Sequence, residues 1–258
     1  MRTTAARVAM ALVGLLVAGA LCWRPLAALW LDNLGSIAYA KGDLGRARAL
    51  FDRGLEFEPR SPALLEDRGR AELDADPAAA LRDLAAADCG AACLAEAGDA
   101  QVRLGDSAAA VDDYLRAKAV TRLETHVAGL ADAGQYEEAI ALERALAGRL
   151  SSSPLDRGNL ARTLWQIGRL EIVAAYRQPA RAAAERADAF KRFRRASELA
   201  PYNESYLLSL GYAELNWGDK RIARRAFARL LELYPHQPDA ERALARLAPE
   251  RATPAPAQ

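Results

Sequence analysis

Two stretches of eighteen residues, far apart in this chain, follow the same template. Residues 42–59 read GDLGRARALFDRGLEFEP, and residues 218–235 read GDKRIARRAFARLLELYP. Each begins with Gly-Asp, carries Ala five residues and Phe nine residues after the glycine, and ends with Pro seventeen residues after it. A Leu-Gly pair precedes each stretch, with its glycine seven residues before the Gly-Asp. A template that recurs with its spacing intact indicates a repeated structural unit, and this constrains the fold more than any other feature.

The template describes two helices joined by a tight turn. The Gly-Asp pair supplies the turn, and the aspartate side chain caps the second helix. The proline ends that helix because it has no backbone N–H group to continue it. The small alanine lets the two helices approach closely, and the phenylalanine fills the space beside it. The sequence therefore predicts helical hairpins.

The pattern resembles the tetratricopeptide repeat (TPR), a hairpin of about 34 residues with Leu-Gly in its first helix and Ala, Phe, Ala and Pro in its second. In the first unit the matching residues are Leu34, Gly35, Ala47, Phe51 and Pro59, with Gly54 in place of the family's second alanine. In the last unit they are Leu210, Gly211, Ala223, Phe227 and Pro235, with Leu230 in that place. The resemblance implies an all-α fold, an α–α superhelix of stacked hairpins, because one hairpin alone cannot bury its apolar faces.

Four further units can be placed between these two. Their anchor alanines, which correspond to Ala47 and Ala223, are Ala80, Ala110, Ala139 and Ala189. The step from Ala139 to Ala189 is 50 residues, whereas the other steps are 29 to 34 residues. This insertion contains an SSSP linker at 151–154 and then a long helical stripe formed by Leu155, Leu160, Leu164, Ile167, Leu170 and Val173. Either a joint between a four-unit and a two-unit stack or one elongated hairpin fits it.

These features divide the chain into four parts. Residues 1–25 are expected to be a membrane anchor or a signal peptide, and residues 26–150 to hold four TPR-like units, the second and fourth of them degenerate. Residues 151–248 are expected to contain the long-helix insertion, two further units and a capping helix that covers the last apolar face. The Pro- and Ala-rich tail at 249–258 is expected to be disordered.

The segment at residues 8–23 contains no charged residue and follows Arg2 and Arg7. It suits a transmembrane helix in which Trp23 lies at the interface, although sixteen residues are short of the roughly 20 that a bilayer requires. It also suits a cleaved signal peptide, because Ala18-Gly19-Ala20 has the small residues of a cleavage site. Both interpretations place the remainder outside the cytoplasm. The repeats are periplasmic in a protein of the bacterial inner membrane, or the protein is secreted or periplasmic after cleavage.

Composition argues against several functional classes. The formal net charge of +1 disfavours a general nucleic-acid binder. His126 and His236 are the only histidines, and neither stands in a zinc-ligand spacing, so no metal or other cofactor is expected. The serines at 151–153 lack the surroundings of a nucleophile, and the basic run KRFRR at 191–195 reads as a solvated helix face or a contact for an acidic partner. We expect a protein without enzymatic activity and without a small-molecule substrate.

Cys89 and Cys93 are close enough in sequence to form a disulfide in an oxidising compartment. If they span one helical turn, their Cα atoms lie about 6 Å apart, which a disulfide tolerates. The alternative is a pair of free cysteines that pack as small core residues.

The TPR resemblance also implies which residues contact a partner, because the family binds peptides and proteins on the exposed face of the first helix of each hairpin. The matching positions here are Asp32, Ser36, Tyr39, Glu66, Arg70, Leu208, Tyr212, Leu215 and Asn216. The clamp that holds a chaperone's terminal carboxylate needs Lys and Asn where this chain has Asp32 and Ser36, so that partner is disfavoured. Packing roles for Tyr39 and Tyr212 are equally compatible with the pattern.

Together these observations predict a protein–protein interaction scaffold of the bacterial cell envelope. Its partners are expected to be membrane or envelope proteins, bound through the TPR groove. The alternative is an accessory or regulatory subunit of an envelope enzyme complex for polysaccharide synthesis, secretion or cell-wall assembly.

Overall fold

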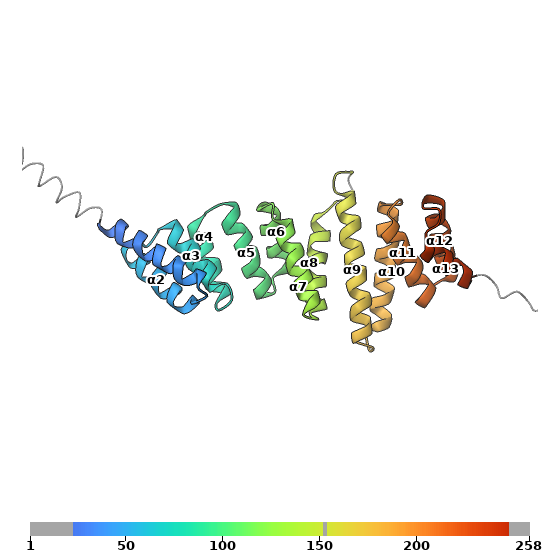
Figure 1. The fold of residues 1–258 in the computed structure, drawn as a ribbon, viewed down its shortest axis with the longest axis horizontal. Helices are drawn as coiled ribbons and strands as arrows, with labels where there is room; N and C mark the ends of the chain where they lie inside the picture. Colours follow the sequence, from blue (N-terminus) through green and yellow to red (C-terminus); the bar gives the residue numbers. More distant parts are fainter. Residues whose placement is uncertain (1–22, 152–153, 248–258) are drawn as a thin grey trace, which may run out of the picture. The chain divides into compact units, whose positions relative to one another are not determined.

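The computed structural model describes residues 23–151 and 154–247, and all regular secondary structure in these ranges is helical. Residues 23–40 are helical. The helices that follow (Figure 1) are α2 (Leu44–Phe57), α3 (Pro62–Glu72), α4 (Pro77–Ala87), α5 (Ala91–Leu104), α6 (Ser107–Arg116), α7 (Val120–Asp132), α8 (Tyr136–Arg149), α9 (Arg157–Arg177), α10 (Ala182–Leu199), α11 (Glu204–Trp217), α12 (Lys220–Leu233) and α13 (Pro238–Leu247). The prediction of an all-α fold is confirmed.

The chain forms two compact units, divided between Leu123 and Glu124. In the first unit, α2 packs on α3, α3 on α4, α4 on α5, and α5 on α6. In the second, the same succession joins α8 through α13. The division expected at residue 150 falls between α8 and α9, which pack against each other inside the second unit.

Two of the three Gly-Asp turns use the left-handed backbone conformation that glycine favours, whereas Gly218 in the third has a φ of −124°. Gly42 and Gly105 adopt positive φ angles of 77° and 78°. This backbone conformation is unfavourable for any residue that has a β-carbon. The aspartates that follow them cap the next helices: Asp43 accepts a hydrogen bond from the backbone N–H of Arg46 at 3.1 Å, and Asp106 accepts one from that of Ala109 at 3.0 Å. The template thus specifies both the turn and the start of the second helix.

A glycine in the first helix of the hairpin lies against a large side chain in the second. A β-carbon on Gly35 would come within 2.3 Å of the Phe51 ring, so the two helices can pack this closely only because Gly35 has no side chain. The same contact recurs in the other hairpins that combine such a glycine with a large apolar residue, at Gly69 with Leu84, Gly98 with Tyr114, Gly168 with Phe193, and Gly211 with Phe227.

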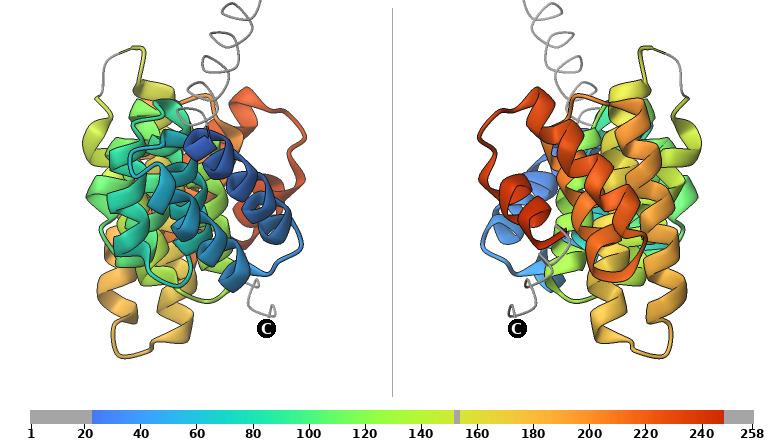
Figure 2. Two further views of the ribbon diagram at one scale, coloured as in Figure 1. Left: turned by 90° about the vertical axis from the view of Figure 1, so that its left-hand side faces the viewer. Right: turned by 90° about the vertical axis from the view of Figure 1, so that its right-hand side faces the viewer.

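The insertion between the fourth and fifth anchor alanines is an elongated hairpin. It consists of α9 and α10, with 21 and 18 residues, which run side by side in both views of Figure 2. One expectation within it is wrong: Leu155 does not belong to the helical stripe. It precedes the start of α9 and is 92% exposed.

The C-terminal helix α13 packs on α12 and α11, as the predicted capping helix would. Its Ala240, Ala243 and Leu247 complete an apolar cluster around Phe227 and Leu230. The apolar segment at 1–22 and the tail from 248 onward lie outside the described residues. Among the helices that the structure does describe, none combines the length and the apolar composition that crossing a membrane requires.

Candidate partner-binding grooves

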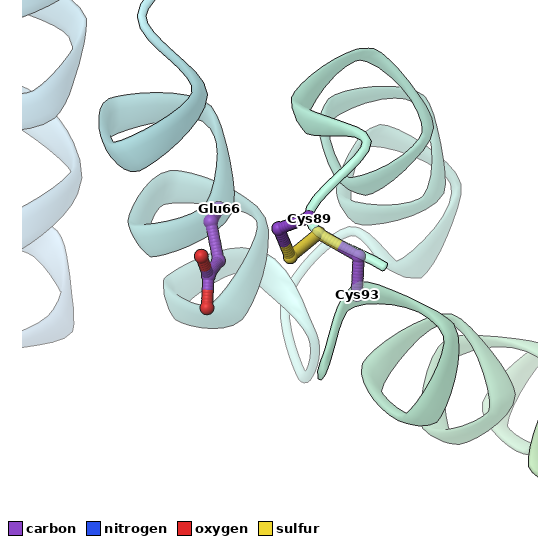
Figure 3. A group of neighbouring side chains, drawn as sticks. All are labelled: Glu66, Cys89 and Cys93. Atoms are coloured by element: carbon purple, nitrogen blue, oxygen red, sulfur yellow. A yellow bond between two sulfur atoms is a disulfide. The ribbon is translucent and has the colours of Figure 1, made fainter. Parts of the chain in front are cut away.

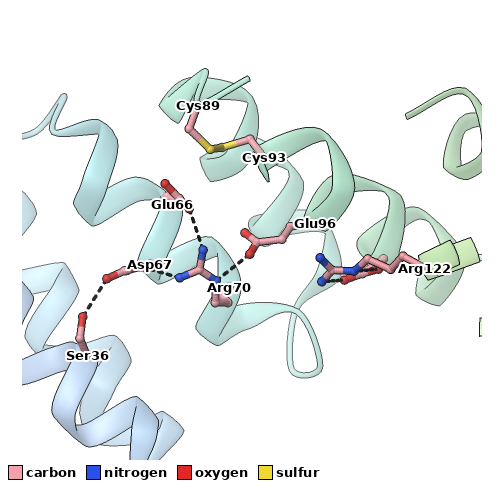
Figure 4. A network of polar contacts seen from close by, with 9 residues as sticks. Ser36, Glu66, Asp67, Arg70, Cys89, Cys93, Glu96 and Arg122 are labelled. Atoms are coloured by element: carbon pink, nitrogen blue, oxygen red, sulfur yellow. Dashed lines mark hydrogen bonds and ion pairs between the residues drawn. A yellow bond between two sulfur atoms is a disulfide. The ribbon is translucent and has the colours of Figure 1, made fainter. Parts of the chain in front are cut away.

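In the first unit, three of the predicted groove residues, Ser36, Glu66 and Arg70, contribute to one polar cluster (Figure 4). Ser36 donates a hydrogen bond to Asp67 at 2.8 Å. The guanidinium group of Arg70 donates to Asp67 at 2.8 Å, to Glu66 at 2.6 Å and to Glu96 at 2.6 Å. The charge of Arg70 is therefore held by three carboxylates of its own chain.

Asp32 lies beside this cluster, and its Oδ1 atom is buried without a hydrogen-bond partner among the described residues. Burial raises the pKa of Asp32, and the negative charges of Asp67 and Glu66 raise it further. Tyr39 lines a cavity of about 90 Å³ together with Ser36, Phe51, Asp67 and Arg70. A cavity of this size leaves little room for a partner side chain in this part of the first unit.

Cys89 and Cys93 are joined by a disulfide where α4 passes into α5, with their Cα atoms 5.3 Å apart (Figure 3). The carboxylate of Glu66 lies near them, and the three side chains form a group with the spacing of metal ligands. The two sulfur atoms are bonded to each other, however, so neither is a thiolate that could bind a metal. Glu66 instead accepts a hydrogen bond from Arg70.

In the second unit, the predicted groove residues of α11 separate into two groups. Leu208 and Leu215 pack against the apolar cluster that α13 completes. Tyr212 and Asn216 line a cavity of about 270 Å³ between α9 and α11. Tyr212 also has a packing role, since its ring lies edge-on to that of Phe227 at a centroid distance of 5.2 Å.

A second cavity, of about 320 Å³, adjoins the first. Its walls come from three helices: α7 contributes Glu124, Val127, Ala128 and Ala131, α8 contributes Tyr136 and Glu143, and α9 contributes Arg162, Gln166, Arg169, Leu170 and Val173. Arg169 and Val173 line both cavities, which therefore adjoin along α9. We call the two cavities together the α9 groove. None of its α7, α8 or α9 residues is among the groove positions predicted from the sequence.

Charged side chains of the α9 groove are paired in different ways. Arg162 donates a hydrogen bond to Glu124 across the space between α9 and α7. The guanidinium group of Arg169 lies 4.8 Å from the centre of the Trp165 ring, a cation–π contact. Glu143 is buried, and burial raises its pKa to about 7; nearby Arg162 opposes this effect and Glu124 adds to it.

The basic run KRFRR on α10 is neutralised by neighbouring acids. Arg192 pairs with Glu171 at 3.1 Å and Arg194 with Glu214 at 2.9 Å, which ties α10 to α9 and α11. The other two cations pair along α10 itself, Lys191 with Asp188 and Arg195 with Glu198. This run serves packing between helices and leaves no unpaired basic patch.

No family model and no curated protein matches this sequence. Several solved structures match most of it at low identity. The Cut9-Hcn1 hetero-tetramer of the APC/C is 14% identical with a TM-score of 0.40, over 91% of this chain and 45% of that one, so this chain spans less than half of its length. YrrB, described as a TPR protein with an unusual peptide-binding site, is 13% identical with a TM-score of 0.35, over 83% of this chain and 90% of that one. PilF of Pseudomonas aeruginosa is 16% identical with a TM-score of 0.37, over 86% and 99%.

Proposed function

We propose that this protein is a non-enzymatic scaffold that binds partner proteins in a helix-lined groove. The α9 groove carries this proposal, because it combines two adjoining cavities with exposed apolar side chains. Val173 is 41% exposed within it, and Tyr176, one turn further along α9, is 63% exposed beside Trp217. Exposed apolar side chains gathered on a grooved surface are typical of a protein-binding site.

We further propose that the partner lies in the bacterial cell envelope and that the repeats are periplasmic, held at the inner membrane by the segment at 8–23 or released from it after cleavage. Two features support this location. The helix at 23–40, which directly follows that segment, exposes Trp23, Leu26, Leu29 and Trp30, side chains that suit a membrane interface. The disulfide between Cys89 and Cys93 is the form that an oxidising compartment maintains.

Photo-crosslinking in intact cells tests the binding role. A photoreactive amino acid in place of Val173 or Asn216 should capture a protein, whereas the same group in place of Arg225, exposed on α12, should not. Equal capture at all three positions, or no capture at any, would contradict the α9 groove as the binding surface.

A reporter fusion tests the location separately. Alkaline phosphatase fused after the last residue should be active, because it folds only when exported. An inactive phosphatase fusion together with an active cytoplasmic reporter at the same position would reverse the proposed topology.

A further inference from the structure

Glu143 stands where the other hairpins carry a large apolar side chain. Four residues after the anchor alanine, those hairpins have Phe51, Leu84, Tyr114, Phe193 and Phe227. Glu143 follows Ala139 by the same four residues, and Val127 lies twelve residues before Ala139, at the spacing that separates Gly35 from Ala47. The fourth hairpin therefore lacks both the glycine and the large apolar side chain that meet in the other hairpins. The residues in their places, Val127 and Glu143, both line the larger cavity of the α9 groove.

Buried carboxylates elsewhere in the described residues are paired with arginine. Six of them form such ion pairs: Glu72 with Arg48, Asp83 with Arg68, Glu96 with Arg70, Asp99 with Arg122, Glu171 with Arg144 and Arg192, and Glu214 with Arg194. Glu143 is just as buried, at 6% exposure. Within residues 23–151 and 154–247, no hydrogen bond or ion pair joins its side chain to another residue, and the nearby Arg162 is hydrogen-bonded to Glu124 instead. Glu143 is thus the exception to a consistent pattern.

The cavity that Glu143 lines has the size and walls for one long side chain. Its volume of about 320 Å³ lies at the lower end of the roughly 300–1,000 Å³ of small-molecule sites. The apolar side chains that line it come from α7 and α9 and include Val127, Leu170 and Val173. A lysine or arginine side chain matches such walls, because its methylene stem packs on apolar surface while its charged end seeks a carboxylate.

We propose that this cavity binds a lysine or arginine side chain of the partner protein, whose positive charge pairs with Glu143. The proposal rests on the function proposed above, in which the α9 groove receives a partner. The partner would supply the cation that the chain itself supplies to its other buried carboxylates. A neutral side chain in the same place would leave Glu143 buried and unpaired, so the site favours a basic residue over an uncharged one of the same shape.

An incoming cation has to compete with the charged groups that already line the cavity. On α7, Glu124 is held by Arg162 of α9, and on α9 the guanidinium of Arg169 rests over the ring of Trp165. Arg162 is the internal rival, since its side chain is close enough to influence Glu143. The site is open to a partner only if Arg162 keeps its bond to Glu124.

Binding of small basic probes to the full-length protein in mild detergent tests this inference. The probes are Nα-acetyl-arginine methylamide and Nα-acetyl-lysine methylamide, and the control is the citrulline analogue, which has the shape of arginine without its charge. Ligand-observed NMR should show that at least one basic probe binds at least tenfold more tightly than the citrulline analogue. Glu143→Gln should abolish this preference, whereas Glu138→Gln, the same change at an exposed position of α8, should preserve it.

Three results would overturn the proposal. The first is no preference for the basic probes, and the second is a preference that survives Glu143→Gln. The third is a preference that arises only in an Arg162→Gln variant, because this would mean that Arg162 occupies the site.

Failure of this proposal can be distinguished from failure of the scaffold role. A partner that crosslinks at Val173 but is insensitive to Glu143→Gln leaves the scaffold standing without the basic-residue site. If a basic probe binds at Glu143 but no partner is captured by crosslinking, the basic-residue site stands and the scaffold role does not.

Discussion

The ring of Phe227 packs directly on the backbone of α11 at Gly211, where a β-carbon would lie 2.6 Å from Cε1 of the ring. Gly211 is needed here because of this contact and not because of its backbone angles, since it lies inside a regular helix. Phe227 is fully buried, so its ring has no open space into which it could move.

Gly211→Ala should therefore lower the stability of the second unit by about 1–3 kcal/mol, the usual cost of overpacking a core. Thermal and urea unfolding, followed by circular dichroism, measure the change. The control is Gly129→Ala in α7, where an added β-carbon meets no atom within 4 Å. That substitution should raise stability by up to about 1 kcal/mol, because alanine is the better helix former. Equal effects of the two changes would refute the steric explanation.

The hydroxyl group of Tyr114 should contribute to the stability of the first unit. It donates a hydrogen bond to the buried carboxylate of Asp99 at 2.8 Å, and Arg122 pairs with the same carboxylate. Tyr114→Phe keeps the ring against Gly98 but removes this donor, so we expect a loss of about 1–2 kcal/mol in unfolding experiments. Tyr206→Phe serves for comparison, because the Tyr206 hydroxyl has no hydrogen-bond partner among the described residues. If both substitutions change the free energy of unfolding by the same amount, the hydrogen bond contributes nothing to stability.

The hairpins could be predicted from the sequence because their determinants are local. Gly35, Ala47 and Phe51 meet inside one hairpin, and each is required by the space available at its own position. The Asp43 cap is equally local, since it acts within one helical turn. The capping helix followed from the same reasoning, because the last hairpin leaves an apolar face that must be covered.

The grooves were less predictable because they depend on contacts between hairpins. Leu208 and Leu215 match groove positions of the family, but they pack on the cluster that α13 completes. A sequence signal for Glu143 did exist, since a charged residue four places after Ala139 breaks the pattern of Phe51 and Phe227. Its burial against α9 could not be inferred, because the 50-residue step obscured how the fourth and fifth hairpins meet.

The disulfide between Cys89 and Cys93 should stabilise the first unit only modestly. The two residues are four positions apart, and a loop this short restricts the unfolded chain little, by roughly 2 kcal/mol in the chain-entropy model. The double variant Cys89→Ser with Cys93→Ser should therefore unfold at slightly lower urea concentration. A reducing agent should shift the wild type toward the variant and leave the variant unchanged. A large loss of structure on reduction would show that the bond does more than close a short loop.

The buried carboxylate of Glu143 should make the stability of the second unit depend on pH. Burial raises its pKa from 4.5 to about 7, so between these values the folded protein holds a proton that the unfolded chain releases. The stability of the wild type should consequently fall as pH rises from about 4.5 to about 7, and stay low above this range.

Glu143→Gln removes the ionisable group, so the variant should be more stable than the wild type at pH 8, by on the order of 2–3 kcal/mol. Near pH 4.5 the difference should shrink, because the wild-type side chain is then mostly protonated in the folded state. Melting temperatures measured at both pH values, with Glu138→Gln as the matched exposed control, give the comparison. Parallel pH profiles for the wild type and Glu143→Gln would mean that Glu143 already has a cationic partner in the free protein, and that the cavity beside it offers no unpaired charge to a ligand.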